Sequence, residues 1–142
     1  MKLKTKQKII ALCAMGMITI GSAGVSFANN HNDSTYTFNF GTLNGSRYTD
    51  GRKKEDASKS YMNCKTMTSG YSYKAKVQAN IGGGERKDVG SPSYTFVTGT
   101  TRRMTNYVLE KGYRAATIKA NSGINTKDTR ATGVWSPDSY QG

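Results

Sequence analysis

The segment YSYKAKVQANI, from Tyr71 to Ile81, decides the fold class of this chain of 142 residues. Apolar and polar side chains alternate along it without a break, so an extended strand would carry the apolar ones on one face. A helix would spread this period of two around its axis. One buried and one hydrated face are typical of an antiparallel sheet. The predicted inward residues of this strand are Tyr71, Tyr73, Ala75, Val77, Ala79 and Ile81.

Shorter segments on both sides show the same alternation and are separated by turn dipeptides such as Asn44-Gly45 and Asp50-Gly51. Further strands are predicted at 35–40, around Arg47 and Tyr48, and at 61–68, 94–98, 102–109, 113–120 and 133–136; a short helix is the alternative for 102–109. The segments 52–60, 85–93 and 121–132 are predicted loops, and Gly82-Gly83-Gly84 a hairpin connection. Six or seven short strands predict an all-β fold, a small antiparallel β-sandwich or barrel.

The faces of these strands predict the core. Its expected members are Tyr36, Phe38, Phe40, Tyr73, Ala75, Val77, Ile81, Tyr94, Phe96, Ile118 and Trp135. Met62, Cys64 and Thr66 share one face of 61–68. Cys64 is either a small buried hydrophobe or a thiol that pairs between two chains.

The N-terminus carries the features of a secretory signal peptide. Lys2, Lys4, Lys6 and Lys8 precede an almost uncharged apolar run, and Ser26-Phe27-Ala28 offers small residues for cleavage after Ala28. An uncleaved membrane anchor is the alternative. We therefore expect a signal peptide at 1–28, a disordered segment at 29–34, and one β domain at 35–142 that is secreted, or retained at the cell surface by its charge. Cleavage would lower the formal charge from +12 to +8, because four of the 21 Lys and Arg and none of the nine acidic residues precede the cut.

The sequence offers little chemistry for catalysis. The single histidine, His31, falls in the predicted disordered segment, and no His/Cys spacing typical of a metal site occurs. The acidic residues Asp50, Glu55 and Asp56 stand among basic ones and predict a solvated, charge-balanced loop. We expect no enzyme activity, no cofactor and no metal.

The basic charge suggests polyanionic partners at a bacterial surface, an anionic cell-wall polymer or the membrane surface. The candidate contacts are Lys65, Lys74, Lys76, Arg102, Arg103, Arg114 and Lys119. A face that only maintains solubility is the alternative. Nucleic acid is disfavoured, because the tyrosines of the best strand alternate inward and do not interleave with the lysines.

The chain ends in a distinctive motif, Gly133-Val134-Trp135-Ser136-Pro137-Asp138-Ser139. With Gly112-Tyr113-Arg114-Ala115-Ala116 and Tyr36-Thr37-Phe38-Asn39-Phe40, it resembles an uncharacterised family of small secreted Gram-positive (Firmicutes) proteins that end in a G-V-W-S-P-D-S-like segment. The resemblance implies export and a small β-rich domain, with no assigned activity. On physical grounds the motif is a cap: Trp135 fills the end of the core, Pro137 stops the strand, and Asp138 or Ser139 satisfies turn amides.

A weaker resemblance links Lys127-Asp128-Thr129 and Gly133-Val134-Trp135 to the K-D-T-x-x-x-G-V-W run of lactococcin-type bacteriocins. Two functions therefore remain open at this point. The first is a non-enzymatic exported protein that associates with the anionic bacterial envelope. The second is a bacteriocin-like exported antagonist that acts on the envelope of competing bacteria.

Overall fold

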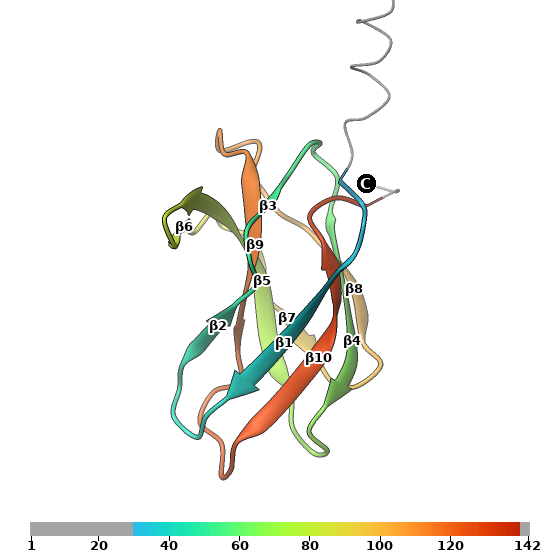
Figure 1. The fold of residues 1–142 in the computed structure, drawn as a ribbon, viewed down its shortest axis with the longest axis vertical. Helices are drawn as coiled ribbons and strands as arrows, with labels where there is room; N and C mark the ends of the chain where they lie inside the picture. Colours follow the sequence, from blue (N-terminus) through green and yellow to red (C-terminus); the bar gives the residue numbers. More distant parts are fainter. Residues whose placement is uncertain (1–29, 140–142) are drawn as a thin grey trace, which may run out of the picture.

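Residues 30–139 are described by a computed structural model, and all regular elements within this range are β-strands (Figure 1). The strands are β1 (Ser34–Phe40), β2 (Ser46–Tyr48), β3 (Arg52–Lys53), β4 (Ser60–Met67), β5 (Tyr73–Gly82), β6 (Glu85–Lys87), β7 (Tyr94–Phe96), β8 (Thr101–Met104), β9 (Ala115–Asn121) and β10 (Thr129–Ser136). The predicted signal peptide and its cleavage site at Ala28 lie outside the described residues. Within 30–139, no helix has the length and apolar character needed to cross a membrane.

The strands form two antiparallel sheets that pack face to face. Sheet A has the order β1-β10-β4-β8. Sheet B has the order β2-β9-β5-β6, with β3 also paired to β9 and β7 to β5. The first and last strands, β1 and β10, lie side by side in sheet A, so both ends of the domain meet at one end of the sandwich (Figure 1). The predicted all-β sandwich is confirmed.

The core between the sheets is built around aromatic side chains. Phe38 of β1 reaches Tyr73 of β5 across the sandwich, with ring centroids 5.9 Å apart, and Tyr73 stacks on Phe96 of β7 at 5.3 Å. Such ring pairs add to the hydrophobic gain of burying their surface. The predicted core residues that are buried are Tyr36, Phe38, Phe40, Tyr73, Ala75, Val77, Phe96, Ile118 and Trp135.

Two predicted core residues are not buried, and one predicted face changes along its strand. Ile81 is 47% exposed because the pairing of β5 with β6 shifts register between Asn80 and Gly82, which turns its side chain out. Tyr94 is half-buried, and its hydroxyl accepts a hydrogen bond from the backbone amide of Thr105. In β4, Thr66 is exposed and Met67 is buried instead.

The change of face in β4 has a bulge as its cause. Cys64 pairs with Gly133 and Thr66 pairs with Thr132, so Lys65 is an extra residue without a partner in β10. One extra residue reverses the inward and outward positions that follow it. A period-two pattern read from the sequence cannot anticipate this reversal, because it depends on the partner strand.

Several predicted loops contain strands, because partner strands supply their hydrogen bonds. β3 lies in the predicted loop 52–60, β6 in 85–93, and the first half of β10 in 121–132. Conversely, β8 ends at Met104, and residues 105–109 are not a strand. The predicted disordered segment 29–34 is described from residue 30 onward: Ser34 begins β1, and the amide of Asn30 donates to the Asp138 carboxylate at 2.8 Å.

Candidate functional site

The outer face of sheet B carries a basic groove, defined by Lys74, Lys76 and Lys119. Lys74 and Lys76 are alternate residues of β5 and point to the same side, and Lys119 of β9 lies directly opposite Lys76 in the register. They line an open hollow of about 530 Å³ on the surface of the sheet. The sequence pattern of β5 predicted the outward direction of two of these lysines, and the pairing of β5 with β9 adds the third.

The rest of the groove is lined mainly by uncharged polar groups. They come from β9, from the residues that follow it, and from segments before β2, β5 and β7: Asn44, Ser72, Ser93, Asn121 and Ser122. Amide and hydroxyl groups can donate hydrogen bonds to an anionic ligand and accept them from hydroxyl groups. The one aromatic lining residue, Tyr73, is buried in the core, so it offers no exposed ring for base stacking.

One carboxylate stands among these lysines. Asp88 follows β6 and forms an ion pair with the Lys76 ammonium, with its second oxygen accepting from the Gly90 amide at 2.8 Å. The hydrogen bond from Lys76 is the main cause that lowers the pKa of Asp88, followed by the bond from Gly90. The positive charges of Lys76 and Lys119 lower this pKa further. Asp88 was not singled out from the sequence, because its approach to β5 depends on the β5–β6 hairpin.

The other four predicted contacts lie elsewhere. Lys65 lies at the bulge of β4, and Arg102 and Arg103 belong to β8 at the edge of sheet A. Arg102 and Arg103 are successive strand residues, paired with Met62 and Tyr61, so they leave β8 on opposite faces. Arg114 is exposed just before β9. The seven candidate residues therefore do not form one surface, and only the three lysines of the basic groove come together.

A second, smaller hollow of about 220 Å³ gathers residues from both ends of the domain. It is lined by His31, Asp33, Tyr61, Arg103, Ser136 and Ser139. His31 lies in this hollow beside Ser136 and Ser139 of the C-terminal motif. No group of three or more side chains suited to bind a metal occurs within residues 30–139.

The C-terminal motif forms a buried polar network at one end of the sandwich. Trp135 is 1% exposed and fills the core there, with the Arg52 guanidinium 5.7 Å from its ring centroid. Gly133 passes so close to β4 that an added Cβ would lie 1.9 Å from the Asn63 carbonyl oxygen. Val134, between them, is half-buried. The first half of the motif therefore packs as the predicted cap.

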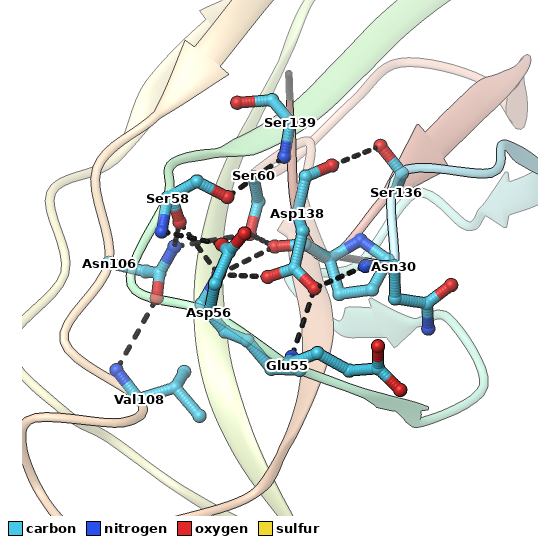
Figure 2. A network of polar contacts seen from close by, with 12 residues as sticks. Asn30, Glu55, Asp56, Ser58, Ser60, Asn106, Val108, Ser136, Asp138 and Ser139 are labelled. Carbon is cyan, nitrogen blue, oxygen red and sulfur yellow. Dashed lines mark hydrogen bonds and ion pairs between the residues drawn. The ribbon is translucent and has the colours of Figure 1, made fainter. Parts of the chain in front are cut away.

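Asp138 is the centre of this network (Figure 2). One carboxylate oxygen accepts from the Lys54 ammonium at 2.8 Å, and the other accepts from the backbone amides of Asn30 and Glu55. Both side chains of the Lys54–Asp138 ion pair are fully buried. Lys54 also donates to the carbonyls of Ser58 and Pro137, so its three protons are all used.

The remaining motif residues complete the same network. Ser136 donates to the Asp138 carbonyl, the Ser139 amide donates to the Ser58 hydroxyl, and Ser60 donates to the Pro137 carbonyl. Burial alone would raise the pKa of Asp138, but the hydrogen bonds from Lys54, Glu55 and Asn30 outweigh it, and the net shift is downward. The carboxylate is therefore charged at neutral pH.

The burial of Lys54 corrects the sequence analysis, which placed it in a solvated, charge-balanced loop. Lys54 is 1% exposed, and its partner is 84 residues away in the chain. No local pattern signals such a pair.

Fold and site together define a small antiparallel β-sandwich with a basic groove on one sheet and a closed polar cap at one end. The chain belongs to the family described as "Protein of unknown function (DUF2712)", which matches residues 24–139. Membership of an uncharacterised family, as the terminal motif suggested, is thereby confirmed. No curated protein and no solved structure matches the chain.

Proposed function

We propose that this protein is exported and binds an anionic polymer of the bacterial cell envelope through the basic groove of sheet B. The observation that carries the proposal is the convergence of Lys74, Lys76 and Lys119 on one open polar surface. Export, a Gram-positive source and a non-enzymatic role are parts of the same proposal. They are supported by the signal-like N-terminus, the basic composition and the family resemblance described above.

The shape and chemistry of the groove favour a polymer with spaced negative charges. Lys74 and Lys76 are two residues apart on one face, which places their Cα atoms about 6.6–6.8 Å apart along the strand. A linear polyanion can meet both lysines at once. Each exposed contact is weak on its own, and several contacts to one chain add up to a salt-sensitive affinity.

Hydroxyl and amide groups around the lysines favour a polyol phosphate, such as a teichoic acid, over a nucleic acid. Ser93, Asn121 and Ser122 can hydrogen-bond to ligand hydroxyls and phosphate oxygens. Proteins that bind single-stranded nucleic acid usually add exposed aromatic rings on which bases stack. The groove has no such ring among its described lining residues.

Binding to purified teichoic acid at low and high salt tests the proposal. The variant Lys74→Gln/Lys76→Gln/Lys119→Gln should bind at least about tenfold more weakly at about 50 mM salt, because each lysine near an anionic surface contributes up to about 1 kcal/mol. The matched control is Lys65→Gln/Arg102→Gln/Arg114→Gln, which removes the same charge from exposed positions outside the groove. Equal losses in the two variants would mean that only net charge matters and would refute the groove.

A growth-inhibition assay on related strains, with the same purified protein, distinguishes envelope binding from the bacteriocin-like alternative. Its resemblance rests in part on Gly133 and Trp135, which are buried in β10. An envelope-binding protein should leave growth unchanged while it adsorbs to cells and is released by a salt wash. Killing by the native protein would favour the antagonist instead.

A further inference from the structure

On the basis of the proposed function, we infer that Lys76 and Lys119 form an anion subsite in which the Asp88 carboxylate stands where a phosphodiester group of the polymer binds. The polymer would displace Asp88 from Lys76 and take over its ion pair. Asp88 thus limits the affinity of the groove through its ion pair with Lys76.

The first support is the position of Asp88. Its carboxylate pairs with Lys76, yet the Asp88 side chain is 54% exposed and the Lys76 side chain only 24%. The carboxylate is therefore the more solvent-accessible member of the pair, and a ligand from the solvent can compete with it. Val89, the next residue, is buried in the core, so the backbone beside Asp88 is anchored. A rotation of the Asp88 side chain would break its ion pair with the Lys76 ammonium.

The second support is the charge balance of the subsite. Lys76 and Lys119 face each other across β5 and β9, and like charges in this position destabilise a sheet. With Lys74, three lysines line the groove, and the Asp88 carboxylate bonds only to Lys76 among them. A polymer phosphate in place of the carboxylate would therefore gain from Lys119 and Lys74 as well.

The third support is the match between a carboxylate and a phosphodiester. Each carries a single negative charge and two unesterified oxygens that accept hydrogen bonds from ammonium groups. One can replace the other without a change in the charge of the subsite. The next phosphate along the polymer can then reach Lys74, which has Asn121 opposite it in β9.

Affinity for purified poly(glycerol phosphate) tests the subsite. Asp88→Asn removes the competing charge while the side-chain oxygen still accepts from the Gly90 amide, and Asp88→Ser is a second neutral variant with an acceptor. Both should bind about fivefold more tightly than the native protein at about 50 mM salt.

Glu110→Gln is the matched control, since it removes one negative charge from an exposed turn at the far end of β9. It should change the affinity less than twofold, because salt screens distant charges. In a Lys76→Gln background, Asp88→Asn should likewise have less than a twofold effect. Equal tightening by Asp88→Asn and Glu110→Gln, or full tightening without Lys76, would overturn the subsite.

The outcomes separate this inference from the proposed function. One outcome is that the triple lysine variant loses binding while Asp88→Asn, made in the native protein, binds no more tightly than the native protein. In that case the groove binds the polymer, and the inference that the polymer displaces Asp88 is wrong. If the triple lysine variant binds as well as its control, the proposed function and the subsite are both wrong.

Discussion

The buried ion pair between Lys54 and Asp138 allows a quantitative prediction of stability. Asp138→Asn keeps the shape of the side chain but removes its charge and replaces one acceptor oxygen by an NH₂ group. The one oxygen that remains can accept from Lys54 or from the backbone amides of Asn30 and Glu55, but not from both sets. Lys54 also keeps the carbonyls of Ser58 and Pro137, which carry no full negative charge. The variant therefore leaves the fully buried Lys54 ammonium without the one negatively charged group among its hydrogen-bond partners.

The expected cost follows from this geometry. Removal of one partner of a buried ion pair typically costs about 3–5 kcal/mol, because a charge is left buried without compensation. The two carbonyls that remain on Lys54 place Asp138→Asn near the lower end, at about 3 kcal/mol. For a domain of this size, that loss should lower Tm by about 10–20 °C.

Urea denaturation at pH 7 measures this cost, with Asp128→Asn at an exposed position as the control. Lys54→Met should be at least as costly, since it leaves the Asp138 carboxylate buried. The double variant should lose clearly less than the sum of the two single losses, because it leaves no unpaired charge. A loss below about 1 kcal/mol for Asp138→Asn would refute the central role of this pair.

The stability of the same variant at acidic pH provides a second test of the ion pair. The pKa of Asp138 is lower in the folded protein than its usual value of 3.8, so its contribution is present above that value and is lost as pH falls through the folded pKa. The stability gap between the native protein and Asp138→Asn should therefore narrow below about pH 4. A gap that stays constant down to pH 2 would contradict this linkage.

Two further predictions concern the neighbouring strands. Gly133→Ala should cost about 3 kcal/mol or more in denaturation, because its Cβ would meet the Asn63 carbonyl oxygen at 1.9 Å. Gly41→Ala, where a Cβ meets nothing within 4 Å, should change stability little, and similar losses in both variants would count against the close approach. The Cys64 thiol is fully buried and burial raises its pKa, so a thiol reagent at pH 8 should label it only after unfolding. Rapid labelling of the native protein, or a disulfide-linked dimer on a non-reducing gel, would show that this side chain is accessible.

The candidate site was predictable only in part, and the reason lies in strand pairing. The alternation in β5 predicted that Lys74 and Lys76 point outward, and both do. That Lys119 stands opposite Lys76 depends on the register between β5 and β9. That Asp88 pairs with Lys76 depends on the hairpin between β5 and β6. From the basic charge of the sequence, seven residues were predicted to contact a polyanion. In the fold, four of these seven lie outside the basic groove.

The sequence by itself determined the fold class and the faces of the regular strands. Successive side chains of an extended chain point to opposite sides as a matter of covalent geometry, so Tyr36, Phe38 and Phe40 or Ala75 and Val77 reveal their common face locally. Only the tertiary structure decided the bulge at Lys65 and the outward turn of Ile81. A register is set by the combined packing and hydrogen bonding of two strands.

The same reasoning applies to the polar cap. The sequence predicted that Trp135 fills the end of the core and that Asp138 or Ser139 satisfies turn amides. In the structure the Asp138 carboxylate instead meets Lys54 and the backbone amides of two distant segments. The tertiary structure determines that Lys54 is the buried partner of Asp138. The antiparallel pairing of β1 with β10 and of β3 with β9 brings three distant segments to one end of the sandwich. A charge is stable inside a protein only when several partners meet it at once, and only the folded chain assembles those partners.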